Sequence, residues 1–275
     1  MTRRNPPRRL GLAFAFASAL AACGGSGAAG STTASAPVAA PTVAAPPAKS
    51  EPTTGEAVIE ASLVALGGRD KLAKITSIKQ TGTLSIQAIG AKGTITILAA
   101  PPRNELTTIE LPGLGKLSQG VHDDVAWELT SMTGARIVTG AERVLALREA
   151  TFQAELNWKE IYPKAELTGV VDFAGTQAYK VVLTAKEGDT QTRFFAKDTF
   201  LPIGVEMTVD SQMGKIPVTV QIFDYREVGG IKYAHKITRK EGQQAIEIVI
   251  DTFEPNLAIP PSAFDLPAEI KALKK

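Results

Sequence analysis

The sequence predicts an α+β domain, mainly β, in which one antiparallel sheet of about ten strands carries two helices. Apolar and polar residues alternate from Ile78 to about Leu129, and again from Ala178 to Phe253, which is the period of a half-buried strand. Turns rich in glycine separate these runs at short intervals, as in an antiparallel meander. Helical spacing is confined to residues 55–66 and 141–162.

The first 22 residues predict a lipoprotein signal peptide. A basic start with four arginines and no acid precedes an apolar run over residues 10–19. This run is shorter than the roughly 20 residues that a membrane-spanning helix needs. The stretch Leu20-Ala21-Ala22-Cys23 resembles a lipobox, which implies that Cys23 becomes the lipidated first residue of the mature chain. Buried acyl chains contribute about 0.8 kcal/mol per CH₂, so we expect a stable membrane anchor outside the cytoplasm.

The chain divides into a signal peptide (1–22), a linker that begins at the lipidated Cys23 (23–54) and a folded domain (55–275). The linker consists mainly of Gly, Ser, Ala, Thr and Pro, so we expect it to be a disordered spacer. Without the signal peptide, 26 Lys and Arg face 28 Asp and Glu, which gives no reason to expect a nucleic-acid partner. The single cysteine leaves no disulfide.

The first half of the domain reads as a helix followed by strands. Ile59, Leu63 and Leu66 form one stripe of a helix over residues 55–66, and Gly67-Gly68 ends it. A short turn over residues 70–75 follows. The strand positions then come in this order: 78–88, a hairpin turn at 90–93, 94–99, 117–121 and 125–129.

The second half begins with a predicted helix from Ala141 to Tyr162. Leu145, Phe152 and Leu156 form its stripe, and Pro163 closes it. Six strands follow to the end of the sheet, at 178–186, 190–196, 205–209, 218–225, 231–239 and 245–253.

Several short motifs resemble the LolA/LolB-like outer-membrane lipoprotein-sorting family over roughly residues 56–268. They are Val121-His-Asp-Asp-Val-Ala-Trp127, Gly140-Ala-Glu142, Arg193-Phe-Phe-Ala-Lys-Asp198, Phe223-Asp-Tyr-Arg-Glu-Val-Gly-Gly-Ile231 and Pro255-Asn-Leu-Ala-Ile-Pro-Pro-Ser-Ala-Phe264-Asp-Leu-Pro267. The resemblance implies a curved, unclosed β half-barrel whose concave face is lidded by helices, and several members hold acyl chains inside. The lipobox and the long spacer make this chain more similar to the acceptor or mycobacterial lipid-carrier branches than to the soluble shuttle.

On this reading, apolar side chains form a ligand-binding cavity beneath the lid. The concave face would contribute Leu84, Ile86, Ile95, Ile97, Leu117, Val121 and Trp127, and the lid Leu145, Phe152, Leu156 and Trp158. The same residues could instead fill a packed core, because periodicity does not distinguish a lined cavity from a solid interior. Arg136, Arg143 and Arg148 could bind an anionic head group, or they could be solvated helix charges.

The sequence contains few residues that could catalyse a reaction or bind a metal ion. Its two histidines, His122 and His235, and the lack of a thiol beyond Cys23 fall short of the three or four protein ligands of a zinc site. It contains neither a G-x-S-x-G elbow nor a P-loop. We therefore expect no enzyme and no cofactor; an envelope hydrolase would require His122, His235 and an acid to meet.

The hypothesis is a monomeric, membrane-anchored extracytoplasmic protein that binds lipid acyl chains or lipoproteins during trafficking in the cell envelope. Gly24 after Cys23 is compatible with an outer-membrane location facing the periplasm. The alternative is an interaction module with a filled core that docks a membrane or periplasmic partner.

Overall fold

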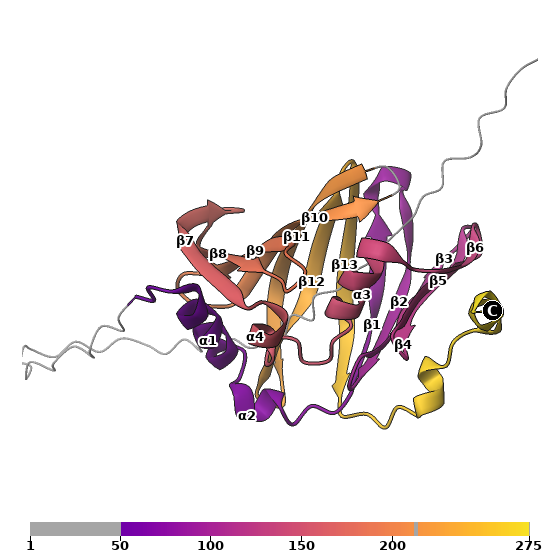
Figure 1. Cartoon of the computed structure of the whole chain (residues 1–275), viewed down its shortest axis with the longest axis horizontal. Coiled ribbons are helices and arrows are strands. Elements are labelled where there is room, and N and C mark those ends of the chain that lie inside the picture. Colours follow the sequence, from indigo (N-terminus) through magenta and orange to yellow (C-terminus); the bar gives the residue numbers. More distant parts are fainter. Residues whose placement is uncertain (1–50, 212–213, 275) are drawn as a thin grey trace, which may run out of the picture.

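The computed structural model describes residues 51–211 and 214–274. The predicted signal peptide, Cys23 and most of the predicted linker lie outside these described residues. Thirteen strands form one antiparallel sheet in the order β6-β5-β4-β3-β2-β1-β13-β12-β11-β10-β9-β8-β7 (Figure 1). The edge strands β6 and β7 do not pair with each other, so the sheet is open. The predicted fold class, a curved and unclosed sheet with helices, is confirmed.

The elements alternate between two runs of strands and two groups of helices. The first run contains β1 (Ile78–Ile86), β2 (Ala91–Ala100), β3 (Asn104–Leu111), β4 (Gly115–His122), β5 (Val125–Thr130) and β6 (Gly134–Ile137). The second contains β7 (Lys164–Phe173), β8 (Thr176–Thr184), β9 (Thr190–Ala196), β10 (Pro202–Ser211), β11 (Gly214–Val228), β12 (Ile231–Glu241) and β13 (Gln244–Pro255). The helices are α1 (Gly55–Ala65), α2 (Arg69–Leu72), α3 (Gly140–Glu149), α4 (Trp158–Ile161) and α5 (Ala268–Leu273), with 3₁₀ turns η1 (Gln87–Ile89) and η2 (Pro261–Phe264).

Helix α1 begins and ends as its sequence predicts. The side chain of Thr54 caps it by accepting a hydrogen bond from the backbone N–H of Ala57 (3.1 Å). Its apolar stripe, with Ile59 and Leu63, packs into a core cluster with Val181 and Leu183 of β8. Among the described residues, no helix is long and apolar enough to span a bilayer.

The first hairpin turns earlier than predicted. The turn occupies η1 and Gly90, and β2 begins at Ala91, so Gly93 pairs with Leu84 inside the ladder. A Cβ atom on Gly93 would lie 2.0 Å from the carbonyl oxygen of Glu110. Glycine is thus needed here for the close approach of β3 and does not mark a turn.

The single helix predicted over residues 141–162 was wrong. Helix α3 ends at Glu149, and a turn-rich segment leads to the one-turn helix α4. Within this segment Gln153 has φ +54°, and its Nε2 donates to the carbonyl oxygens of Leu72 (2.6 Å) and Ile75 (2.9 Å). These long-range hydrogen bonds hold a conformation that a continuous helix does not allow.

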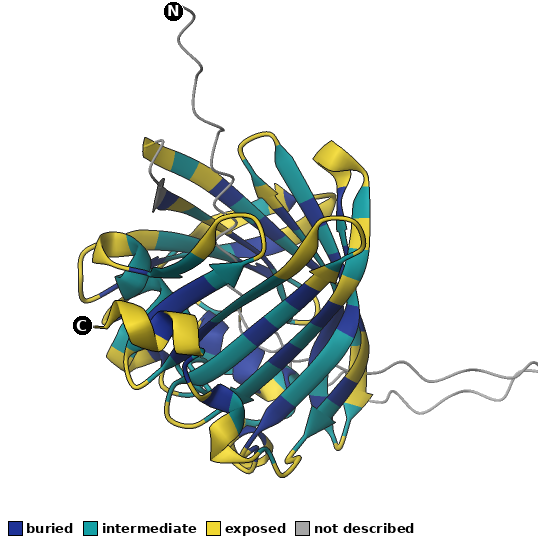
Figure 2. Cartoon of the chain, turned by 90° about the vertical axis from the view of Figure 1, so that its right-hand side faces the viewer, coloured by how far each residue is buried: buried dark blue, intermediate teal, exposed yellow. Residues whose placement is uncertain are grey.

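The sheet curls around α3. This helix contacts both β5 and β10, which lie eight places apart in the sheet. A flat sheet would separate these strands by about 38 Å, whereas ten helical residues span about 15 Å. The curved sheet therefore brings its two arms to opposite sides of the helix (Figure 1), and burial alternates along its strands (Figure 2).

Candidate functional site

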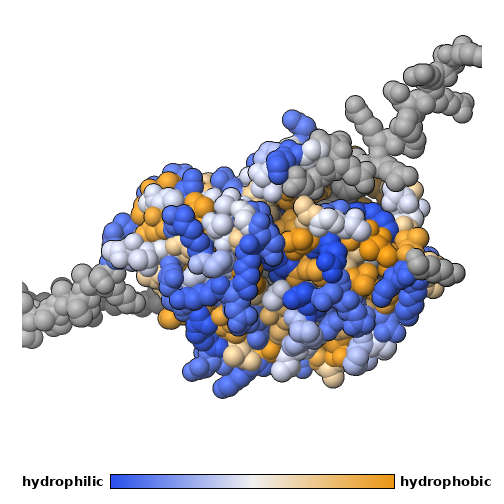
Figure 3. All heavy atoms as spheres, in the orientation of Figure 1, coloured by the Kyte–Doolittle hydropathy of each residue, from blue (hydrophilic) through white to orange (hydrophobic). Residues whose placement is uncertain are grey.

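A lid crosses the concave face of the sheet. We define it as residues 140–161, which comprise α3, the connecting segment and α4. Leu145 packs against Val205 and Val220 on one arm of the sheet. On the other arm, Ala146 and Leu147 pack against an apolar cluster that contains Val121, Ala126, Val138 and Ala150. The lid therefore bridges β10 and β11 to β4 and β5. In the view of Figure 1, apolar side chains gather on the side of α3, whereas hydrophilic atoms dominate near α1 and α4 (Figure 3).

Polar contacts at both ends of helix α3 add to this apolar packing. The helix contains no fully buried residue. Arg148 forms a bidentate ion pair with Asp189 in the β8–β9 turn, with one N–O distance of 2.9 Å. At the other end, Glu142 accepts from Arg136 (2.6 Å), and Arg143 donates to the carbonyl oxygen of Asp124 (2.9 Å). The Arg148 side chain is only 10% exposed, and Arg136 and Glu142 are about one-third exposed, so solvent screens these pairs only in part. They hold the two ends of α3 against the two arms of the sheet.

Each of the three arginines named by the sequence thus bonds to a protein group. Arg136 also donates to Glu128, whose side chain is only 5% exposed. These contacts explain how α3 is positioned, and they give no sign of a head-group site.

Four small cavities surround the lid. Their volumes are about 40, 70, 30 and 30 Å³. Glu149 lines three of them, and Glu155 also lines three. Binding pockets for small molecules usually enclose about 300–1,000 Å³. The lid segment from Glu149 to Glu155 therefore divides the interior into spaces that are each too small for an acyl chain.

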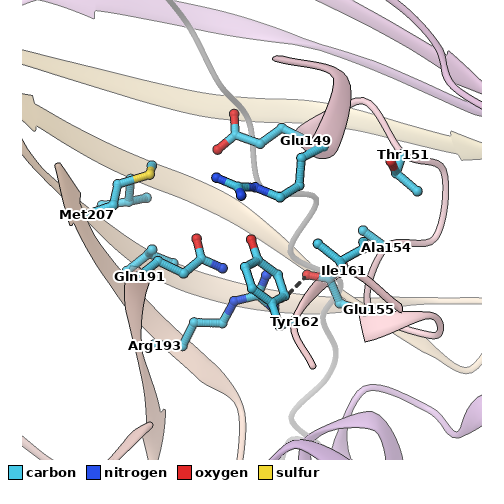
Figure 4. Close-up of a pocket in the computed structure, with 12 residues that line it drawn as sticks. Glu149, Thr151, Ala154, Glu155, Ile161, Tyr162, Gln191, Arg193 and Met207 are labelled. Atoms are coloured by element: carbon cyan, nitrogen blue, oxygen red, sulfur yellow. Dashed lines mark ion pairs between the residues drawn. The ribbon is translucent and has the colours of Figure 1, made fainter. Parts of the chain in front are cut away.

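The 40 Å³ cavity has a polar wall. Arg193 of β9 forms an ion pair with Glu155 (3.5 Å), and its guanidinium lies 5.3 Å from the ring centroid of Tyr162. Arg148 lies 5.6 Å from the same centroid. Figure 4 shows Glu149, Tyr162, Gln191 and Arg193 around this space. Burial raises the pKa of Tyr162, which keeps its hydroxyl protonated.

Two carboxyl groups lie inside the hollow. Glu105 of β3 and Glu149 of α3 line the same two cavities, of about 70 and 30 Å³. Burial raises the pKa of Glu105 to about 8, and the negative charge of Glu149 adds to this shift. Burial raises the pKa of Glu149 to about 7, although Arg239, Arg148 and Arg193 oppose that shift. Within the described part of the chain, Oε2 of Glu149 has no hydrogen-bond partner.

Sequence reasoning missed this polar interior because it missed β3. The pairs Glu105–Val121 and Thr107–Gln119 place polar side chains of β3 on the concave face. Thr107 is fully buried on the same face as Glu105. Polar residues at inward positions weaken the apolar alternation that identifies a strand. Strands β6 and β7 were missed as well: β6 has only four residues, and most of β7 is exposed or half-buried.

The predicted concave-face residues occupy three places. Leu84, Ile86, Ile95 and Ile97 form one buried cluster, with Leu117 at its edge. Val121 lies beneath α3 and lines the 70 Å³ cavity. Trp127 differs from the expectation: it borders that cavity, but its side chain packs with Leu266 and Ile270 near α5. Because Trp127 follows Ala126 in a strand, its side chain points to the opposite, outer face.

The predicted lid residues also separate. Leu145 lines the 70 Å³ cavity, and Phe152 and Leu156 line one of about 30 Å³. Trp158 is 2% exposed and belongs to the core cluster under α1. Its indole N–H donates to Glu60 (3.1 Å).

The two histidines do not come together. His122 pairs through Nδ1 with the amide oxygen of Asn104 (2.8 Å). His235 pairs through Nδ1 with the carbonyl oxygen of Ile250 (2.7 Å). They lie on β4 and β12, five places apart in the sheet. In the described part of the chain, no three His, Cys, Asp or Glu residues are placed to hold a metal ion.

Three solved structures are similar to this chain in overall fold. A DUF1329-family protein from Desulfovibrio piger superposes with a TM-score of 0.55 at 13% identity, over 78% of this chain and 98% of that one. A LolA-superfamily protein from Nitrosomonas europaea gives 0.53 at 12% identity, over 78% and 98%. The chain shares the fold of this LolA-superfamily protein. A domain described as an outer membrane lipoprotein-sorting protein, from Vibrio parahaemolyticus, gives 0.51 at 11% identity, over 80% and 100%.

No protein-family model matches the sequence, and no curated protein matches it. The likeness is therefore one of fold. The lid over the concave sheet and the chemistry of the site are therefore argued from this chain's own residues.

Proposed function

We propose that this protein is a monomeric, membrane-anchored extracytoplasmic protein that binds acyl chains of lipids or lipoproteins between its lid and its concave sheet. It has no enzymatic role in this proposal and works in lipid or lipoprotein trafficking within the cell envelope. Acylated Cys23 would tether it, with the outer membrane as the favoured location. The observation that carries the proposal is that α3 bridges both arms of the sheet without one fully buried residue.

Binding requires the lid to move. The four cavities of about 30–70 Å³ surround the segment from Glu149 to Glu155, so displacing this segment would merge them. Each CH₂ transferred from water into the merged space contributes about 0.8 kcal/mol, and a long chain would offset the loss of the polar contacts at the lid ends.

The primary experiment is native mass spectrometry of protein purified without detergent, together with uptake of a fluorescent fatty acid. We expect a bound lipid or saturable uptake. A lid lock sharpens the test: Arg148→Cys with Asp189→Cys, in a Cys23→Ser background, is joined by a short bis-maleimide. The locked protein should lose uptake, whereas the same variant without crosslinker should keep it. Absence of lipid and of uptake in the unlocked protein would overturn the proposal.

One observation favours the alternative, an interaction module with a filled core that docks a membrane or periplasmic partner. The cavities are small, and Leu84, Ile86, Ile95 and Ile97 pack against one another. On this alternative, the locked and unlocked proteins would capture the same crosslinked partner, and neither would take up fatty acid.

A further inference from the structure

Three adjacent hairpins end in exposed apolar side chains at one end of the sheet. Ile89 lies in the β1–β2 turn and is 54% exposed, and Leu114 lies in the β3–β4 turn and is 39% exposed. Met132 lies in the β5–β6 turn and is 73% exposed. We call these three turns the hairpin rim. Antiparallel order places the rim at one end of the first run of strands.

The strand register staggers the three turns by about two residues, or about 7 Å, from one turn to the next. Thr94 pairs with Glu110, so the pair that closes the β3–β4 turn, Leu111 with Gly115, lies two residues short of Ala91, where the first turn closes. Leu117 pairs with Thr130, and the N–H of Ser131 donates to the carbonyl oxygen of Lys116 (3.0 Å). Neighbouring tips are two strands apart, which corresponds to about 10 Å. The three tips therefore lie on an oblique line of about 24 Å along the edge of the sheet and do not form one compact patch.

Lysines flank the same tips. Lys92 and Lys116 are the second residues of β2 and β4, and Lys240 is the next-to-last residue of β12, beside the next turn along the rim; all three are exposed. Two acids lie at these tips: Glu110, whose carboxylate is 3.8 Å from the ammonium of Lys116, and Glu241, which pairs with Arg239 (3.1 Å). Apolar tips with lysines behind them match an anionic membrane surface, where each lysine contributes about 1 kcal/mol.

We propose that the hairpin rim docks onto an anionic phospholipid bilayer, with Ile89, Leu114 and Met132 inserted among the lipids. Spaced, convex tips fit a fluid surface better than a protein partner, which offers fixed pockets. The chain outside the structure allows this contact, because the 27 residues between Cys23 and Glu51 reach about 90 Å at most. The inference is independent of the proposed cargo, since the rim would dock whether or not the hollow holds a lipid.

The test is cosedimentation of the full chain carrying Cys23→Ser with phosphatidylglycerol–phosphatidylethanolamine vesicles. We expect binding that weakens with salt and is much lower on phosphatidylcholine vesicles. Ile89→Ser, Leu114→Ser and Met132→Ser together should weaken binding at least about tenfold. The matched control replaces three exposed apolar residues away from the rim, Val64, Leu257 and Leu273, by serine, and it should bind normally.

Charge and insertion are tested separately. Lys92→Gln, Lys116→Gln and Lys240→Gln should reduce binding severalfold, whereas Lys74→Gln, Lys271→Gln and Lys274→Gln should not. The fluorescence of Met132→Trp should shift to the blue on these vesicles, and that of Val64→Trp should not. All these sites are exposed, so unchanged circular dichroism confirms folding. No binding by the parent chain, or equal loss in the rim and control variants, would overturn the inference.

Discussion

The carboxyl groups of Glu105 on the sheet and Glu149 on the lid border the same two cavities. Burial moves both pKa values upward from about 4.5, to about 8 for Glu105 and about 7 for Glu149. The closed state of the lid is therefore most stable when both carboxyl groups are protonated. Ionisation adds two negative charges on opposite sides of the same space, which disfavours the closed lid.

The first prediction concerns pH. Each acid has a higher pKa in the folded protein than in the unfolded chain, so the unfolded chain releases its protons first as pH rises. The free energy of unfolding should fall from about pH 4.5 until both acids are ionised, near pH 8. Urea midpoints measured across this range should show the decline.

Glu105→Gln combined with Glu149→Gln should flatten that decline, because neither amide titrates. Glu110→Gln is the control, since Glu110 is an exposed acid on the same strand. An unchanged pH slope in the double variant would show that these carboxyls do not control the closed state.

The second prediction concerns the ion pair that holds the lid. Asp189→Ala removes the carboxylate that pairs with Arg148. Loss of about 1 kcal/mol of attachment should speed fatty-acid uptake about fivefold in stopped-flow fluorescence. Glu166→Ala breaks an exposed pair with Lys164 on β7 (2.8 Å), outside the lid, and serves as the control. Equal uptake rates for Asp189→Ala and the parent would mean that this pair does not limit lid opening.

The sequence predicts well where a local pattern decides the structure. The stripe of Ile59 and Leu63 identified α1, and the alternation around Ile95 identified β2. Prediction from sequence fails where groups far apart in the chain determine the local structure. Gly93 looks like a turn residue, yet the approach of Glu110 from the next strand requires it. The break after α3 likewise depends on hydrogen bonds between residues about 80 positions apart.

In the candidate site, too, residues set by a local pattern were predicted and residues set by long-range contacts were not. Val121 and Leu145 were placed at a cavity beneath the lid by period and resemblance together. Trp127 was assigned to the same face, but strand alternation with Ala126 turns its ring outward, towards α5. Glu105 was missed because its strand, β3, lacks a clean apolar pattern, and Glu149 was missed because it is the last residue of α3, inside a helix predicted to continue to Tyr162.

The third prediction tests the hydrogen bonds of Gln153. Gln153→Ala removes the donor to the carbonyl oxygens of Leu72 and Ile75. The Leu72 carbonyl keeps the N–H of Ile75 (3.1 Å), so the loss falls mainly on the Ile75 carbonyl, and a buried acceptor that loses its donor costs about 1–3 kcal/mol. Urea unfolding should show this loss, whereas Gln87→Ala, in an exposed turn, should have little effect. Similar urea midpoints for the two variants would show that the break in the lid has another cause.

The last prediction separates a usable hollow from a solid core. Ala146 lies on α3 and lines the 70 Å³ cavity, whereas Ala141 on the same helix is exposed. Ala146→Phe should fill the space under the lid and reduce fatty-acid affinity about tenfold, because a ring displaces apolar contacts that the chain would make. Ala141→Phe should bind as the parent does. Trp127→Phe should also keep its affinity, since that ring packs on the outer face with Leu266. If Ala146→Phe binds normally while Trp127→Phe does not, the ligand lies on the outer face and the lid has no part in holding it.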